Sequence, residues 1–434
     1  MQEKKAFGFW SALFLGIGSM VGAGIFVLLG EAGAISGNLV WISFILGGII
    51  ALLSGYSLAK LASAYPSRGG IVEYLVQCYG EGVFSGSISV LFYLSAIVAL
   101  AMVTKTFGAY SSMMLSSANI EYTNIFALGI LFSFVVINLI GSTLIAKSEN
   151  FIVLLKLSII LIFTIVVSFY IHPEYLAIKN APPILNIFSS IALTFFAYEG
   201  FRVITNTAED MQDPSKVMMK SMLVAIGLVM ILYVAVAFAV FGNLTLPQII
   251  KAQDYALAEA AKPIFGSLGF TIMSVAALIS TSSSINANLY AITNVTYDMA
   301  KNGELPEIYE RNVYHSSEGL IISAFFIAML VLFFDLQEIA AIGSISMLFI
   351  HAFVHIGHLL KRKETGASLF LLLLAIVTIF GAITLALQYT SKHIPNVGYY
   401  IVIGFILALL IEVGLRLFTK RTVKQQTTKI QADE

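Results

Sequence analysis

Residues 16–26 read GIGSMVGAGIF, and they place Gly16, Gly18, Gly22 and Gly24 near the middle of a long apolar segment. Each glycine disfavours a helix by about 1 kcal/mol relative to alanine. In a bilayer the freed backbone groups need other partners, so unwound chain persists only where protein buries it or where it lines a cavity. The segment therefore predicts either a helix broken at Gly22-Ala23-Gly24, at a binding site, or a close contact of these residues with a neighbouring helix.

The composition excludes a water-soluble protein. Of the 434 residues, 59% are hydrophobic and 11% are charged, whereas soluble domains carry roughly a quarter charged residues. A helix needs about 20 apolar residues to cross a bilayer, and such runs recur from Trp10 to Phe418 with short polar breaks. The formal net charge is zero, which indicates no nucleic-acid partner. We therefore expect an all-α integral membrane protein.

The apolar runs predict twelve membrane spans in a single transmembrane domain, 1–434. The expected spans are 9–34, 39–64, 84–113, 124–145, 148–172, 184–209, 216–242, 264–300, 318–334, 337–360, 367–389 and 397–418. No small-residue cleavage pattern follows the first of them, so it is read as a retained helix. All the prolines lie at or between span ends, so a break inside a span needs another cause. Glycine is the candidate.

Basic residues indicate which side of the membrane each loop occupies. Twelve spans put both termini on one side, and most of the lysines and arginines between spans share that side. The opposite side has only Lys179, Lys251, Lys262 and Lys392. Because cytoplasmic loops are enriched in Lys and Arg, we expect both termini, and a tail over 419–434, in the cytoplasm.

The sixth span favours unwinding over close packing in the first. Residues 195–202 read FFAYEGFR, which puts two charges and a glycine near the middle of this span. Charges there are costly in lipid. Interrupted spans at matching positions are typical of two inverted repeats with substrate bound where they meet. The expected repeats cover about 9–172 and 184–360, with two additional helices over about 367–418.

Four intramembrane residues carry charges that need an explanation. Lys156 lies about eight residues into the fifth span, where its amine could bind carbonyls of the broken first helix or, alternatively, bend back toward the headgroups. A lysine taken out of water exchanges its proton more readily. Lys105 lies nearer the outer face, where snorkelling or a structural hydrogen bond is expected. Glu199 and Arg202 are one helical turn apart and either pair with each other or act on substrate.

Other polar clusters indicate no catalytic or metal site. The eighth span has a run of hydroxyl residues, 280–284, which could pack across helices or line a polar path. His351, His355 and His358 share a helical face, but no nearby carboxylate or cysteine completes a metal site. We find no nucleophile and base set and no phosphate-binding glycine loop, so an enzyme is the least expected class and no cofactor is expected.

Over essentially its whole length the sequence resembles permeases of the amino acid-polyamine-organocation superfamily. The resemblance rests on GSMVGAGIF at 18–26, on the stretch from Phe196 through Pro214, and on NVTYDMAKNGELP at 294–306. It implies a LeuT-like fold with five-plus-five inverted repeats, broken first and sixth helices and two additional helices. Residues 151–157 match the stretch that bears the coupling lysine of proton-coupled, broad-specificity members.

The resemblance also implies a role for particular residues. Lys156 falls on the coupling lysine, Gly18 on the glycine whose carbonyl meets it, and Ser282 and Ser283 on the facing part of the eighth span. The substrate-binding residues it implies are Ile17, Gly22, Ala23, Gly24, Ile25, Phe195, Phe196, Ala197, Tyr198, Glu199 and Phe201. A substrate carboxylate would sit on the N–H groups that open the second half of span one, where the helix dipole is positive.

These expectations describe an amino acid:proton symporter of the plasma membrane that works by alternating access. Its partners would be amino acids, protons and the lipid bilayer. The alternatives are substrate exchange, sodium coupling, or a sensor or channel that has kept the fold without coupled transport. The charge of Lys156 at the position of a coupling ion disfavours sodium.

Overall fold

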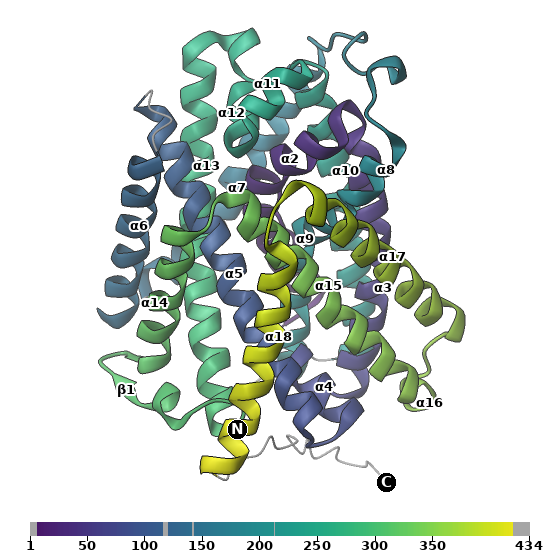
Figure 1. The fold of residues 1–434 in the computed structure, drawn as a ribbon, viewed down its shortest axis with the longest axis vertical. Helices are drawn as coiled ribbons and strands as arrows, with labels where there is room; N and C mark the ends of the chain where they lie inside the picture. The colour runs from purple at the N-terminus through teal and green to yellow at the C-terminus, as the bar shows by residue number, and fades with distance from the viewer. Residues whose placement is uncertain (1–6, 116–119, 141–142, 212, 420–434) are drawn as a thin grey trace.

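The fold is a bundle of helices, seen in a computed structural model that describes residues 7–115, 120–140, 143–211 and 213–419 (Figure 1). The α-helices are α1 Phe9–Met20, α2 Ala23–Ser36, α3 Val40–Ala64, α4 Ile71–Tyr79, α5 Val83–Met114, α6 Ile120–Ile140, α7 Thr143–Ser168, α8 Ile184–Ser189, α9 Ile191–Ala197, α10 Pro214–Phe241, α11 Leu246–Lys251, α12 Ala256–Glu259, α13 Lys262–Lys301, α14 Glu318–Phe333, α15 Leu336–Leu360, α16 Arg362–Thr365, α17 Leu369–His393 and α18 Val397–Gly414. Five short 3-10 segments, η1 Gly37–Leu39, η2 Ile178–Asn180, η3 Glu199–Asp210, η4 Gln253–Tyr255 and η5 Glu307–Glu310, and one π turn, η6 Leu415–Thr419, complete the helical part. Strands β1 Asn312–Val313 and β2 Ser316–Ser317 pair as an antiparallel hairpin.

The helices have the length and composition of membrane spans. Within the described residues, 10 helical segments are long and apolar enough to cross a bilayer, and α1 and α14 are shorter apolar helices. Helices α11 and α12 lie at one end of the bundle, and α4, α16 and the β1–β2 hairpin lie at the other (Figure 1). The sequence analysis assigns this second end to the cytoplasm. The predicted tail from residue 420 onward lies outside the described residues.

The break in the first span lies slightly earlier than the sequence predicts. Helix α1 ends at Met20 and α2 begins at Ala23, so the non-helical residues are Val21 and Gly22. Gly24, which was expected to be part of the break, is already helical. Its role is close packing, because a Cβ atom there would lie 2.3 Å from the carbonyl oxygen of Ala197. Of the two alternatives for this glycine cluster, unwinding thus applies to Gly22 and close packing applies to Gly24.

The sixth span is also interrupted, where the sequence predicts it. Helix α9 ends at Ala197, and after Tyr198 the chain continues as the 12-residue 3-10 segment η3. Runs of 3-10 helix longer than three or four residues are uncommon and often mark a hinge. The next span begins sharply, because Pro214 occupies its first turn and Asp213 caps it. Hydrogen bonds from Lys216 and Ser215 lower the pKa of the Asp213 carboxyl group to about 2.

Lys105, the first of the intramembrane charges, has a structural role. Its side chain is buried, and its amine donates hydrogen bonds to the carbonyl oxygens of Val331, at 2.9 Å, and of Phe334. Both carbonyls lie at the end of α14, where a helix leaves its last acceptors without partners. Lys105, which lies on α5, therefore caps the C-terminal end of α14. Of the two expectations for this lysine, the structure shows the structural hydrogen bond.

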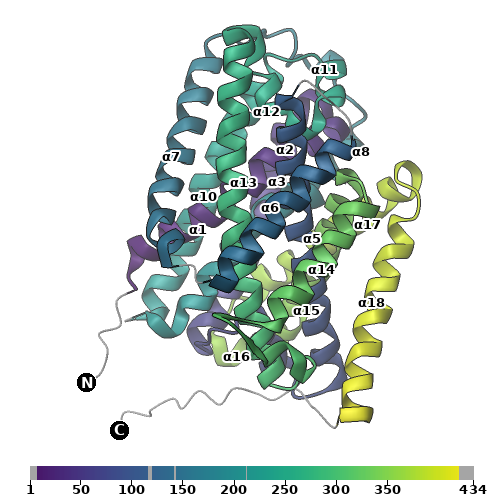
Figure 2. The same ribbon diagram turned by 90° about the vertical axis from the view of Figure 1, so that its left-hand side faces the viewer.

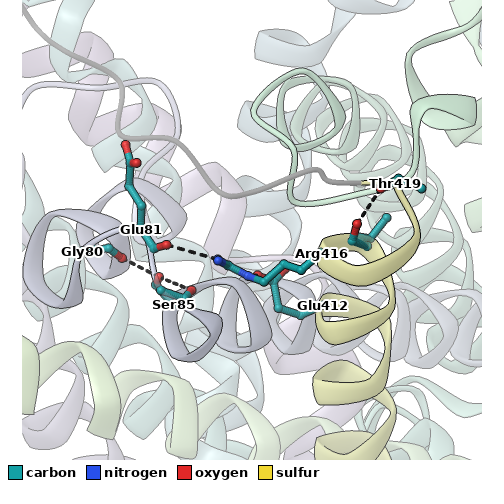
Figure 3. Close-up of polar contacts among 8 residues, drawn as sticks. Gly80, Glu81, Ser85, Glu412, Arg416 and Thr419 are labelled. Carbon is teal, nitrogen blue, oxygen red and sulfur yellow. Dashed lines mark hydrogen bonds and ion pairs between the residues drawn. The ribbon is translucent and has the colours of Figure 1, made fainter.

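The last helix, α18, lies at the edge of the bundle (Figure 2) and packs on α5 through an ion pair formed at its own C-terminal end. Glu412 is fully buried and pairs with Arg416, whose guanidinium also donates to the carbonyl oxygen of Glu81, 3.1 Å away (Figure 3). Gly86 of α5 leaves room for this pair, since a Cβ atom there would lie 2.3 Å from the Glu412 carboxyl carbon. A buried carboxylate is costly unless it is paired.

The pair predicts an asymmetric response to substitution. Arg416→Met should destabilise the protein by about 2–3 kcal/mol, because it leaves the Glu412 carboxylate buried without its partner. Glu412→Gln, which removes the charge and keeps the shape, should cost less, and Arg416→Met combined with Glu412→Gln should recover part of the loss. Thermal unfolding of the purified protein in detergent measures these differences. Strictly additive losses would mean that the two side chains do not stabilise each other.

Candidate functional site

The two breaks meet at a single hydroxyl group. Tyr233 of α10 is fully buried, and its hydroxyl lies 2.7 Å from the carbonyl oxygen of Met20 and 3.3 Å from that of Ala197. These two carbonyls end α1 and α9, so they have lost their helical partners. A buried carbonyl without a partner costs roughly 1–3 kcal/mol. Tyr233 thus stabilises both interruptions from one position.

Lys156 reaches the first break from the other side. Its amine is buried and lies 2.9 Å from the carbonyl oxygen of Gly18, to which it donates a hydrogen bond. Gly22 faces the same amine, because a Cβ atom at Gly22 would lie 3.3 Å from Lys156 Nζ and 3.3 Å from the hydroxyl oxygen of Ser280. The structure therefore brings together the lysine and the glycine that the sequence analysis paired, beside the unwound residues.

The eighth span also contributes Ser280, which the resemblance did not single out beside Ser282 and Ser283. Ser280 faces Gly22 and is fully buried, and its hydroxyl has no hydrogen-bond partner among the described residues. Ser283 is buried three residues later, on the same helical face, whereas Ser282 is half-buried on a neighbouring face. In a helix, residues i and i+3 share a face and residues i and i+2 do not. The hydroxyl row beside the break therefore starts at Ser280 and continues to Ser283.

The start of α2 provides backbone donors. Gly22 is the N-cap residue and has no side chain to satisfy the first N–H groups of the helix, which belong to Ala23, Gly24 and Ile25. The N-terminus of a helix carries a partial positive charge and binds anions. The surroundings of the Ala23 side chain lie outside the described residues, whereas Ile25 is fully buried and Ile17, below the break, is half-buried. A carboxylate of small size fits the chemistry of this helix start.

The two interrupted spans touch through their backbones. A Cβ atom on Gly200 would lie 2.5 Å from the backbone nitrogen of Met20 and 2.5 Å from the carbonyl carbon of Ser19. Together with Gly24 against Ala197, this makes two places where only glycine fits. Glycine at both contacts lets span one and span six approach closely, so the two breaks form one site.

Glu199 is held by two partners within the protein. Arg202 Nε lies 2.9 Å from Glu199 Oε1, and His351 Nε2 lies 3.0 Å from Glu199 Oε2. The Arg202 guanidinium also stacks over the ring of Phe92, 4.8 Å from its centroid. The sequence analysis left a choice between an internal pair and a substrate contact, and the structure shows the internal pair. It adds His351, which the sequence analysis treated as having no nearby carboxylate.

The aromatic residues of span six line the interior. Phe195, Tyr198 and Phe201 are fully buried and Phe196 is nearly so. The Tyr198 hydroxyl donates to the carbonyl oxygen of Phe44, 2.9 Å away in α3. These side chains surround the breaks with apolar surface, which strengthens polar contacts inside.

Both ends of the site are covered. On the side of α11 and α12, α2 packs so tightly on η4 that a Cβ atom on Gly30 would lie 2.0 Å from the carbonyl oxygen of Gln253. On the side of α4 and α16, the Arg68 guanidinium pairs with Asp210 at 2.7 Å, and Phe7 forms a bridge with Met211. A solute can reach the breaks only if one of these covers moves.

Sequence reasoning missed Tyr233, Ser280 and the pairing of His351 with Glu199. Each is a contact between residues far apart in the chain, which spacing within one helix cannot reveal. A polar hydroxyl in the otherwise apolar seventh span was a signal for Tyr233. For Ser280, a helical count along the serine run would have separated the face of Ser280 and Ser283 from that of Ser282.

Comparison with known proteins shows the family to which the sequence belongs. The family model described as amino acid permease matches residues 7–368. An uncharacterized protein of Methanocaldococcus jannaschii is 36% identical over 97% of both chains. The inner membrane transport protein YbaT of Escherichia coli is 34% identical over 84% of this chain and 86% of its own, and the serine/threonine exchanger SteT of Bacillus subtilis is 27% identical over 81% of each.

The family model covers most of the chain, including both interrupted spans. The described part of the chain also has the many apolar helices of a multi-pass membrane protein. A transport role, rather than catalysis, follows from the family. The chain belongs to the amino acid permease family and is an amino-acid transporter of the membrane.

Proposed function

We propose that the chain is an amino acid:proton symporter and that Lys156 is its coupling group. The observation that carries the proposal is the hydrogen bond from Lys156 Nζ to Gly18 O, beside Gly22 and Ser280. A protonated amine stabilises the end of α1 through this bond, and loss of the proton weakens it. The position of the C-terminal end of α1 relative to α7 then depends on whether the Lys156 amine is protonated.

The architecture that fits this role has twelve spans in two inverted five-helix repeats, followed by α17 and α18. Spans one and six are the interrupted members of the repeats, which supports substrate binding between them. The distribution of basic residues supports cytoplasmic termini in the plasma membrane. Because both ends of the site are covered, substrate enters and leaves by movement of one cover at a time, which is alternating access.

The substrate is a zwitterionic amino acid in this proposal. Its carboxylate binds the N–H groups that open α2, and its ammonium takes the carbonyl oxygens of Met20 and Ala197, which Tyr233 holds in the structure. Glu199 already has Arg202 and His351 as partners. The pairing of Glu199 with Arg202 and His351 favours neutral amino acids as substrates over cationic ones, since a cationic side chain would have to displace Arg202 from Glu199.

Exchange of one amino acid for another is the second candidate. It is favoured by the relationship to a protein named as a serine/threonine exchanger. Sodium coupling is disfavoured because a lysine amine occupies the place beside the broken helix where a cation would bind. A channel or a non-transporting sensor would share the fold without coupling.

Substitution of Lys156 tests the coupling. In proteoliposomes, uptake of labelled amino acids by the wild type should rise as the external pH falls, because the proton is a co-substrate, and should not need sodium. Lys156→Met should lower gradient-driven uptake by about tenfold or more and flatten its pH dependence. Exchange between labelled and unlabelled amino acid at equal pH should persist, since it needs no net proton movement.

Lys105→Met is the matched control, because Lys105 is also a buried lysine that donates to carbonyl oxygens. It should lower thermal stability without a selective loss of gradient-driven uptake. Wild-type uptake that depends on sodium, or a Lys156→Met variant with unchanged pH dependence, contradicts the proposal. Exchange in the absence of any gradient-driven accumulation supports the second candidate.

Gly200→Ala tests whether the two breaks form one binding site. The added methyl group meets the backbone of Ser19 and Met20, which cannot move away as a side chain can. Spans one and six must then separate, and substrate affinity should fall at least tenfold in a binding assay. The control is Gly227→Ala in α10, where a Cβ atom has nothing within 4 Å. Equal affinities for the two variants would show that the contact at Gly200 is irrelevant to binding.

A further inference from the structure

A row of histidines and serines connects α15 with α3. His355 Nδ1 lies 2.9 Å from the hydroxyl oxygen of Ser57, and the same hydroxyl lies 2.7 Å from His358 Nδ1. His358 Nε2 lies 2.8 Å from the hydroxyl oxygen of Thr365. On the inner side, His355 Nε2 lies 3.0 Å from the hydroxyl oxygen of Ser54. The two serines are one helical turn apart on α3 and occupy both nitrogens of His355.

The row begins at the candidate functional site. His351 is fully buried and bonds Glu199 Oε2 through Nε2. Phe195 and Phe201 pack against its ring, with centroids 5.2 and 5.8 Å away. Apolar walls leave an imidazole few directions in which to exchange a proton. The neighbouring imidazole is that of His355, whose ring lies 5.8 Å from the His351 ring.

One step of the row has no direct hydrogen bond. His351 Nδ1 is buried and has no hydrogen-bond partner among the described residues, and the rings of His351 and His355 are 5.8 Å apart. Ser54 lies on this side of His355. In the relay proposed below, one water joins His351 Nδ1 to the Ser54 hydroxyl, since ordered waters commonly bridge buried polar groups.

The row ends at the face that the sequence assigns to the cytoplasm. Thr365 closes α16, which lies at the same end of the bundle as α4 (Figure 1). It is half-buried, and the next residue, Gly366, is exposed. The three imidazoles and three hydroxyls therefore extend from a buried carboxylate at the substrate position to the protein surface.

We propose that these side chains form a proton relay between the cytoplasmic face and Glu199, separate from Lys156. The proposal rests on the proposed function, since it names the path of a proton in the same transporter. It also gives a role to His351, His355 and His358, whose shared helical face the sequence analysis left without one.

Each step of the relay conserves protons. A proton from the cytoplasm binds His358 Nε2, and His358 releases the proton on Nδ1 to the Ser57 oxygen while the Ser57 hydroxyl gives its own proton to His355 Nδ1. His355 Nε2 passes a proton to Ser54 in the same way, and Ser54 passes one to His351 Nδ1. His351 Nε2 then delivers its proton to Glu199 Oε2. During inward symport the same transfers run in reverse, so that a proton leaves Glu199 and reaches the cytoplasm through His358 Nε2. Neutral imidazole both donates and accepts, which makes this sequence of transfers possible.

Arrival of the proton changes the contact that holds η3. Protonated Glu199 no longer carries the charge that attracts Arg202, 2.9 Å away. A buried arginine that loses its partner is strongly unfavourable, so the first turn of η3 must rearrange. The relay thus links cytoplasmic proton concentration to the interrupted half of span six.

Other ionisable groups surround the relay on the elements packed against it. They are Glu199 and Arg202 from η3, Lys60 and Tyr65 from α3, Cys78 and Tyr79 from α4, and Lys361 and Glu364 beside α16. Lys60 lies near the outer end, since a Cβ atom at Gly366 would lie 4.0 Å from Lys60 Nζ. The inner end has the Glu199 carboxylate.

Substitution of Ser57 tests the relay, since this hydroxyl is the bridge between two imidazoles. Full-length protein in proteoliposomes with an internal pH-sensitive dye gives two readouts, substrate-dependent proton flux and amino-acid exchange at equal pH. Ser57→Ala should lower proton flux and gradient-driven uptake about tenfold and leave exchange within about twofold of the wild type. His355→Gln, which keeps hydrogen-bonding groups but does not titrate, should behave alike.

Ser43→Ala is the control, because Ser43 is a buried serine on the same helix whose hydroxyl donates to the carbonyl oxygen of Ile187. It should leave both readouts unchanged. Unaltered proton flux in Ser57→Ala and His355→Gln overturns the relay and leaves the symporter intact. Equal loss of flux and exchange in both variants assigns the row a structural role instead. Wild-type vesicles without substrate-dependent proton flux overturn the symporter proposal itself and the relay with it.

Discussion

The structure depends on one requirement, that backbone carbonyls freed inside a membrane protein find another donor. Two spans are interrupted in the middle of the bundle. Each interruption leaves buried carbonyl oxygens without their helical partners. The hydroxyl of Tyr233 meets the carbonyls of both Met20 and Ala197. Lys156 meets that of Gly18. These donors come from α10 and α7, so the interruptions are stable only when the neighbouring helices are in place.

The same requirement explains the charges in the interior. Lys105 completes the end of α14, Glu412 is paired with Arg416, and Glu199 is shared between Arg202 and His351. Each of these three buried charges therefore has a partner supplied by the fold. The pairs differ in what a proton would do to them. A lysine bonded to carbonyls holds its contact more strongly when it is protonated, whereas a carboxylate paired with an arginine holds its contact more strongly when it is ionised.

Local sequence patterns were enough to predict the positions of the helices and the two interruptions, because hydropathy, proline and glycine act within a few residues. The contact of Lys156 with Gly18 was predicted only through resemblance to a family. Ser280 belongs to the hydroxyl run that the sequence indicated, but nothing within that run showed which hydroxyl faces Gly22. Tyr233 and the pairing of His351 with Glu199 could not be predicted, because both join spans that are distant in the chain and no pattern within either span specifies its partner.

The opposite signs of the two proton responses have a consequence for the transport cycle. Lys156 contacts α1 and Glu199 begins η3, and these two segments touch where Gly200 meets Ser19 and Met20. Under the proposed roles, a proton on Lys156 secures α1, and a proton on Glu199 loosens η3. A uniform rise in proton concentration would then secure one segment and loosen its neighbour. Opening toward the cytoplasm is favoured most when Glu199 gains a proton and Lys156 loses one. The conformation of α1 and η3 then depends on the order in which Lys156 and Glu199 exchange protons, and not on pH alone. A transporter driven by a proton gradient requires such a dependence.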